Sequence, residues 1–171
     1  MVSRRGLDLE FSGGVMDWER VLEFLRALYD HRVEYVLVGA VGMNVQGIVR
    51  ASRDVDIFVR PEPDNVARLR SALRQVFPED SQIEEITAED LAGEYPAVLY
   101  NSPDGSLSID ILARLGEAFV YSDIQFEEKV FEEITVRVAT PRMLYEMKKD
   151  TLRLQDRADA EAIKQEFKLE D

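Results

Sequence analysis

Apolar residues recur along the first half of the chain with a helical period in some stretches and a strand period in others. Between Asp17 and His31 they repeat every three or four positions, which predicts an amphipathic helix with Asp17 as its cap. "VEYVLVG" then indicates a buried strand that ends at Gly39, and "AVGMNVQG" indicates a short helix that ends at Gly47. The apolar segment "VDIFV" is typical of a further strand, and "PEPDNVARLRSALRQVF" predicts another helix.

The second half of the chain is richer in β-strand patterns. We expect strands over residues 83–87, 97–100, 107–112 and 134–138, with "NSPDGS" as a turn between two of them. From Pro141 the pattern is helical to the end, with a break near Asp156. The order of elements therefore predicts an α+β fold in which a mixed sheet is flanked by helices.

Composition narrows the function classes. The 171 residues match the usual length of one domain, and a hydrophobic content of 46% suffices for a core. The chain has no cysteine and a single histidine, His31, which excludes disulfide frameworks, cysteine-based zinc sites and histidine-rich metal sites. The remaining possibility for a metal or catalytic site is one built from carboxylates that bind a hard cation. Because there is neither an apolar run of membrane-spanning length nor a signal-peptide pattern, we expect a soluble, cytoplasmic protein without a membrane partner.

The charge balance is strongly acidic. A net charge of −13, from 34 acids against 21 bases, disfavours a protein that coats duplex nucleic acid. It does not exclude a local basic groove, because Arg50, Arg53 and Arg60 flank one acidic strand and further cations cluster near the C-terminus. A phosphate-bearing ligand could therefore find cations, although most such residues in proteins are solvated surface.

Two acids inside an apolar strand are the main chemical signal. In "SRDVDIFVR" Asp54, Asp56 and Phe58 share one strand face, so two like charges lie side by side unless a cation compensates them. In "GSLSIDILARL" Asp110 takes the polar face of a later strand. If the two strands pair, Asp110 comes within cross-strand reach of Asp54 or Asp56. Three converging carboxylates are a geometry that Mg²⁺ accepts, completed by waters and substrate phosphates.

A purely structural interpretation of these acids is also open. Asp54 would cap the strand start, Asp56 would pair with Arg53 or Arg50, and Asp110 would be solvated; an isolated D-x-D favours this interpretation. The preceding strand, glycine and helix favour chemistry instead. Backbone N–H groups are free where a helix starts, and Gly39 lets a phosphate approach without a Cβ in its path.

The order of these features resembles the nucleotidyltransferase fold of the DNA polymerase β superfamily, and more closely the bacterial small nucleotidyltransferases related to the AbiEii toxins. That family has an Arg-x-(Thr/Ser)-x-Asp-x-Asp strand, then a helix with a lysine, then Arg-x-x-Asp-x-x-Asp. The matching positions here are Arg50, Ser52, Asp54, Asp56, Lys148, Arg153, Asp156 and Asp159. The resemblance spans about residues 33–163 and implies one domain, with a nucleotidyltransferase core at about 17–138 and C-terminal helices at about 140–171.

The resemblance also implies ligands and roles for individual residues. Asp54, Asp56 and Asp110 would bind Mg²⁺ or Mn²⁺ and serve catalysis, while Gly39, Ala40, Arg53 and Lys148 would contact the NTP. The family commonly has glycine or serine where this chain has Ala40. That change keeps the backbone N–H and removes a hydroxyl contact to phosphate.

Helical spacing distinguishes Lys148 from Lys149. Lys148 lies nearer the apolar stripe and has to find an anion there, either an acid or a nucleotide phosphate, unless its stem merely runs past that stripe to solvent. Lys149 can pair with Glu146 in solvent. For Asp156 and Asp159 we expect helix-capping or arginine-pairing roles first.

We therefore predict a two-metal enzyme that moves an NMP group from an NTP to an acceptor hydroxyl with release of pyrophosphate. The acceptor, whether tRNA, protein or a small molecule, stays open, and a toxin–antitoxin protein partner is expected from the resemblance. Two alternatives from other classes are a catalytically idle nucleotidyltransferase-like module that binds a protein partner, and a two-metal nuclease. The glycine turn before the acids favours a triphosphate ligand over the nuclease.

Overall fold

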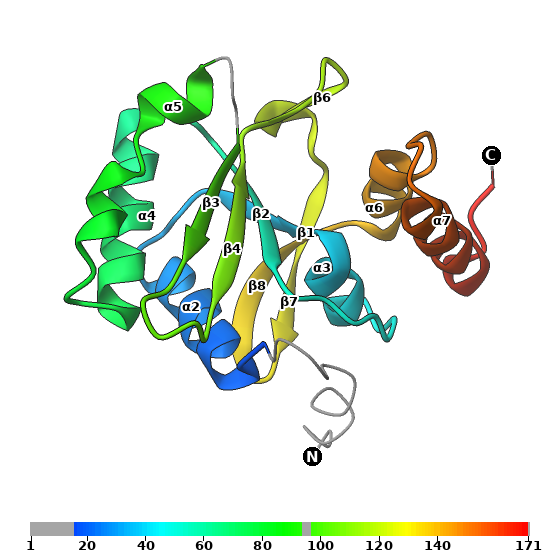
Figure 1. Cartoon of the computed structure of the whole chain (residues 1–171). Helices are drawn as coiled ribbons and strands as arrows, with labels where there is room; N and C mark the ends of the chain where they lie inside the picture. Colours follow the sequence, from blue (N-terminus) through cyan, green and yellow to red (C-terminus); the bar gives the residue numbers. More distant parts are fainter. Residues whose placement is uncertain (1–15, 94–96, 171) are drawn as a thin grey trace.

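A six-stranded mixed sheet forms the centre of this computed structural model, which describes residues 16–93 and 97–170 (Figure 1). The strand order is β3-β4-β2-β1-β8-β7. The strands are β1 (Tyr35–Val38), β2 (Val55–Val59), β3 (Ala97–Asn101), β4 (Ser108–Leu112), β7 (Phe126–Phe131) and β8 (Ile134–Ala139). β2 runs antiparallel to β1 and parallel to β4, and β5 (Arg114–Leu115) pairs with β6 (Phe119–Val120) in a separate small hairpin. The predicted α+β fold with a mixed sheet is confirmed.

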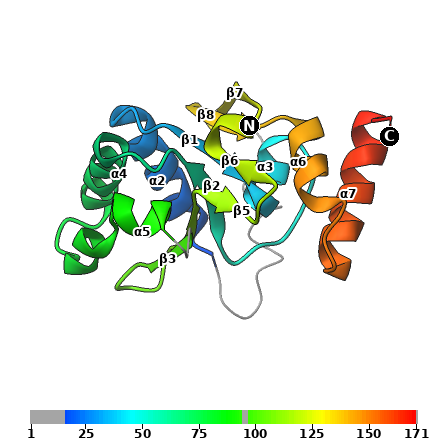
Figure 2. The same cartoon turned by 90° about the horizontal axis from the view of Figure 1, so that it is seen from above.

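Helices cover both faces of the sheet. They are α2 (Trp18–Asp30), α3 (Gly39–Val45), α4 (Pro63–Val76), α5 (Ala88–Ala92), α6 (Pro141–Lys148) and α7 (Leu154–Phe167), with the 3₁₀ turns η1 (Ser81–Glu85) and η2 (Tyr121–Asp123). Figure 2 shows α2, α4 and α5 on one side of the sheet and α3, α6 and α7 on the other, with α7 outermost. Within the described residues, no helix is long and apolar enough to cross a bilayer.

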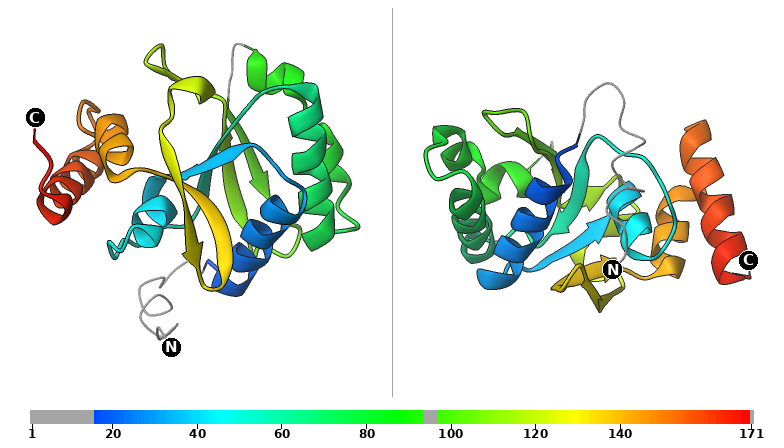
Figure 3. Two further views of the ribbon diagram at one scale, coloured as in Figure 1. Left: turned by 180° about the vertical axis from the view of Figure 1, so that it is seen from behind. Right: turned by 90° about the horizontal axis from the view of Figure 1, so that it is seen from below.

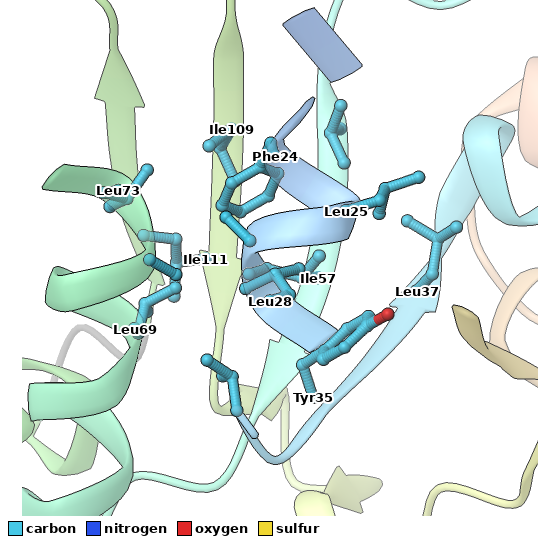
Figure 4. Close-up of a cluster of buried hydrophobic side chains, with 14 of the residues drawn as sticks. Phe24, Leu25, Leu28, Tyr35, Leu37, Ile57, Leu69, Leu73, Ile109 and Ile111 are labelled. Atoms are coloured by element: carbon cyan, nitrogen blue, oxygen red, sulfur yellow. The ribbon is translucent and has the colours of Figure 1, made fainter. Parts of the chain in front are cut away.

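The larger hydrophobic core lies between the sheet and helices α2 and α4 (Figure 4). Val55, Ile57 and Val59 point into it from β2, whereas Phe58 belongs to the second core under α3 and α6. The period of two in β2 therefore sends Asp56 to the face that carries α3, α6 and α7. The fully buried side chains of the larger core include Phe24, Leu25, Leu28, Leu69, Leu73, Ile109 and Ile111.

Most predicted elements are present, and one is wrong. Residues 83–87 were expected to form a strand, but 83–85 lie in η1, and Ile86 and Thr87 connect η1 to α5. Local capping decides this, because the side chains of Asp80 and Thr87 accept backbone N–H groups of the turns that follow them. The helical tail breaks between Lys148 and Leu154, a few residues before the expected position near Asp156, so that α6 and α7 pack against each other (Figure 3). Strand β7, with the polar sequence FEEKVF, was not predicted.

A buried amide fastens α4 to the sheet. Asn65 is 1% exposed; its Oδ1 accepts from the backbone N–H of Glu34 at 2.7 Å, and its Nδ2 donates to the carbonyls of Glu34 and Arg60 at 2.8 and 2.9 Å. These bonds satisfy backbone groups just before β1 and just after β2. A side chain without hydrogen-bonding groups would leave the N–H of Glu34 and the carbonyl of Arg60 without these partners, whereas the carbonyl of Glu34 also accepts from the backbone N–H of Arg60 at 3.3 Å.

We expect Asn65→Leu to destabilise the protein by about 2–4 kcal/mol, because each buried group left without a partner costs roughly 1–3 kcal/mol. Urea unfolding monitored by circular dichroism measures the change. Ser71→Ala, which removes a side-chain bond on the same helix, is the control and should stay within about 0.5 kcal/mol of the wild type. Equal stability of the two variants would show that Asn65 does not fasten α4.

Candidate functional site

The register between β2 and β4 places Asp56 directly beside Asp110. The two strands are parallel, and the side-chain carboxyl groups of the pair are close enough for Asp110 to perturb the titration of Asp56. Asp54 lies just before β2, near enough for its charge to act on Asp56. The structure thus brings Asp56 and Asp110 together, but among the described residues the three acids do not form the compact group that the sequence predicted.

Burial and like charge together perturb Asp56. Burial raises its pKa most, and the negative charge of Asp110, the hydrogen bond with Asp110 and the charge of Asp54 raise it further, to about 7. Lys148 opposes the shift. A carboxyl group with such a pKa has too little positive charge around it, so this part of the sheet is suited to a cation.

Gly39, the first residue of α3 directly after β1, lies against Asp56. Its φ is +64°, and a Cβ built there would lie 2.1 Å from Oδ2 of Asp56. The residue before it, Val38, pairs with Asp56 across β1 and β2. Only glycine fits this position without displacing the carboxylate, since it tolerates the positive φ and has no side chain. Ala40 follows and is buried in the first turn of α3.

Asp56 and Asp110 form a pair with Asp54 beside it, and the three acids do not surround a metal position by themselves. Among the described residues, no three carboxylate or imidazole side chains are gathered closely enough to form a metal site by themselves. At Asp54 the Ser52 hydroxyl donates to the carbonyl and accepts from the backbone N–H, at 2.7 and 3.2 Å. Mg²⁺ in phosphoryl-transfer sites usually takes one or two carboxylates and completes its shell with water and phosphate. The donor set of Asp56 and Asp110, with Asp54 beside it, fits that chemistry.

Lys148 lies at the edge of the acidic pair but is held by other residues. Its Nζ is 2.9 Å from Asp159 and 3.3 Å from Asp156, and its side chain is only 12% exposed. Asp159 also accepts from Nε of Arg50 at 2.8 Å. Both C-terminal acids therefore bind cations of the site region. The expectation that they pair with arginine was correct for both acids. Asp159 pairs with Arg50, which lies before β2, and Asp156 lies 3.9 Å from Nε of Arg153.

A structural role for Asp56 would require an ion pair with Arg50 or Arg53, and neither arginine neutralises Asp56. Arg50 is engaged by Asp159, and Arg53 is exposed and forms no ion pair with any described residue. The predicted contact of Arg53 with phosphate stays a prediction. Lys149 pairs with Glu146 at 2.8 Å, as the helical spacing predicted.

A cavity of about 400 Å³ lies at the opposite end of the same strands. It is bordered by Arg60 after β2 and by Arg114 after β4. Arg60 is already neutralised by Glu34 and Glu62. The cavity lacks the paired acids and the glycine turn, so we place the candidate site at Asp56 and Asp110.

Comparison with known proteins identifies the class. The fold is similar to that of a Thermotoga maritima protein classed as a nucleotidyltransferase, with a TM-score of 0.53 and 14% identity over 88% of this chain and 92% of that chain. It is also similar to ANT(2″)-Ia, solved with adenylyl-2″-tobramycin, with a TM-score of 0.52 and 11% identity over 88% of this chain and 90% of the other. Among curated proteins, none matches the sequence significantly. The fold is that of the nucleotidyltransferases.

The sequence identifies the family within that class. Residues 23–164 match the family model described as nucleotidyl transferase AbiEii toxin, type IV TA system. The chain belongs to the AbiEii family, as the order of its motifs indicated.

Gly39→Ala should destabilise the protein more than Gly47→Ala, by roughly 1–3 kcal/mol, because both positions have a positive φ and only residue 39 has Asp56 against it. A Cβ at Gly47 would have nothing within 4 Å. Paired urea titrations measure the difference. Equal losses in the two variants would mean that Asp56 is not fixed against Gly39.

The raised pKa of Asp56 also predicts a pH dependence. The folded protein retains a proton that the unfolded chain has lost between about pH 4 and pH 7, so the wild type loses stability as the pH rises through this window. Asp56→Asn lacks that loss. In EDTA it should melt several degrees above the wild type at pH 8 and close to it at pH 4. A lower melting temperature of the variant at pH 8 would instead indicate a structural role for the ionised carboxylate.

Proposed function

We propose that this AbiEii-family protein is a metal-dependent nucleotidyltransferase of the two-metal type, which transfers an NMP group from an NTP to an acceptor hydroxyl. The observation that carries the proposal is the pair of adjacent acids Asp56 and Asp110, which is partly buried, has no arginine partner among the described residues and has Gly39 against Asp56. Structural acids in a sheet are usually compensated by donors or cations. Acids left with a raised pKa next to a glycine turn are better explained by a ligand that supplies positive charge.

The transfer requires a base for the acceptor hydroxyl, an open approach of the acceptor oxygen to the α-phosphorus, and neutralisation of the negative charge on the triphosphate. The acceptor oxygen forms a bond to the α-phosphorus, the bond from that phosphorus to the bridging oxygen breaks, and pyrophosphate leaves with the electron pair. The Asp110 carboxylate would receive the proton of the acceptor hydroxyl. Mg²⁺ or Mn²⁺ bound by Asp54, Asp56 and Asp110 would supply the positive charge that the triphosphate and the leaving group need.

Phosphate contacts come from the side of β1. The chain after Gly39 presents backbone N–H groups of Ala40 and the next residues without a side-chain cap. Lys148 uses its ammonium group, and Arg53 is exposed nearby in sequence to the acids. We assign these four residues to the NTP on that basis.

The family suggests a biological setting. The type IV toxin–antitoxin description of the matched model favours an antitoxin protein as partner and a toxin role for this chain. ANT(2″)-Ia was solved with a nucleotidylated small molecule, so a small-molecule acceptor stands beside tRNA and protein. A catalytically idle binding module is the second candidate, favoured by the open arrangement of the three acids.

We expect Mn²⁺ with a non-hydrolysable NTP to raise the melting temperature of the wild type, since a ligand at about 100 times its Kd stabilises by roughly 2.7 kcal/mol. Asp56→Asn should lose this rise, and it should also fail to transfer label from α-labelled NTPs to RNA, protein or small molecules of a cell extract. Asp64→Asn, an exposed acid at the start of α4, is the matched control and should behave as the wild type.

Two results separate the candidates. Nucleotide-dependent stabilisation without transfer of label to any fraction would favour the idle module. An equal response of Asp56→Asn and the wild type to Mn²⁺ and nucleotide would remove Asp56 from the site.

A further inference from the structure

Four charged side chains, between 4% and 27% exposed, form a group between the loop before β2 and the C-terminal helices. Arg50 comes from the loop between α3 and β2, Lys148 from the end of α6, and Asp156 and Asp159 from α7. The two positive and two negative charges of these residues balance, and the exposed Arg153 lies 3.9 Å from Asp156 at the edge of the group. We call this group the charge cluster.

Asp159 is the centre of the charge cluster. Its side chain is 4% exposed, the least of the four, and it receives hydrogen bonds from Arg50 Nε at 2.8 Å, Lys148 Nζ at 2.9 Å and Gln155 Nε2 at 3.0 Å. Burial alone would raise the pKa of Asp159, but these donors outweigh it and hold the pKa below its ordinary value. The carboxylate is therefore ionised at neutral pH and fixes both cations.

The position of Lys148 follows from this contact. An ammonium group has three donors, and two of them point to Asp159 and Asp156. The third is left for another acceptor, and the group lies close enough to Asp56 for its charge to be felt there. Figure 2 shows α6 next to α3, the helix that begins at Gly39.

Resting on the proposed function, we infer that Asp159 is a positioning residue for nucleotide binding. It holds the Lys148 ammonium in place for a phosphate of the NTP, and it ties α7 to the Arg50 loop that leads into Asp54 and Asp56. Asp159 itself touches neither nucleotide nor metal. Its effect on the nucleotide passes through Lys148.

A double-mutant cycle on the full chain tests this inference. Calorimetry below the melting temperature gives the Kd of a non-hydrolysable NTP with Mn²⁺, and of Mn²⁺ alone, for Asp159→Asn, Lys148→Met and the double variant. Asp159→Asn should weaken nucleotide binding about tenfold, the size of one charge-assisted hydrogen bond, and leave the Kd of Mn²⁺ alone unchanged. Because Asp159 acts through Lys148, the double variant should bind nucleotide no more weakly than Lys148→Met.

The controls change the same charges outside the cluster. Glu161→Gln lies on α7 and is exposed, and Lys149→Met is the neighbour that pairs with Glu146. Both should bind nucleotide as the wild type does. If Asp159→Asn does not fold, Asp159→Glu keeps the charge but displaces the carboxylate, and it should weaken nucleotide binding severalfold while Glu161→Asp does not.

Three outcomes contradict the inference. If Asp159→Asn binds nucleotide with the same Kd as its control, Asp159 serves stability only. The same conclusion follows if Asp159→Glu is used in its place and matches its own control. Additive losses in the double variant show a direct role. A wild type that binds Mn²⁺ but no NTP overturns the proposed function, and the positioning role with it.

Discussion

The repulsion between two neighbouring carboxylates on the central strands is the constraint on which the rest of the structure depends. Parallel pairing of β2 and β4 puts Asp56 and Asp110 side by side, and the larger core holds both strands in register through the alternate residues. The core thus stabilises an arrangement that the acids themselves oppose. Gly39 closes the site from β1, where any side chain would meet Asp56. Stability supplied on one face of the sheet maintains an unfavourable charge pattern on the other.

A second charge system lies beside the first and differs from it in one respect. Arg50, Lys148, Asp156 and Asp159 balance one another, whereas the acids of β2 and β4 lack a matching cation. The balanced group joins α6 and α7 to the sheet, and the unbalanced group is left for a ligand. A binding site for a metal–nucleotide complex requires such a division. The balanced charges hold the side chains that orient the ligand, and the carboxylates without a cation attract the metal.

Much of this could be predicted from the sequence, because the decisive patterns are local. Period-two alternation sent Asp56 and Asp110 to the polar faces of their strands, and a glycine at the end of β1 indicated close approach. The contact of Arg50 with Asp159 spans 109 positions and has no local signature beyond the spacing of two acids on α7. Residues 83–87 were misjudged because capping by Asp80 and Thr87 outweighs their apolar content. Asn65 was missed because its partners are backbone groups of distant segments.

The central claim is that Asp56 and Asp110 bind the metal of a nucleotide complex. The most direct test is anomalous scattering from crystals grown with Mn²⁺ and a non-hydrolysable NTP. The account predicts a manganese peak within coordination distance, about 2.0–2.4 Å, of carboxylate oxygens of Asp56 and Asp110, with the phosphates on the side of Gly39 and Lys148. Manganese and nucleotide bound elsewhere, such as in the cavity beside Arg60, with no metal at the two carboxylates, would contradict it.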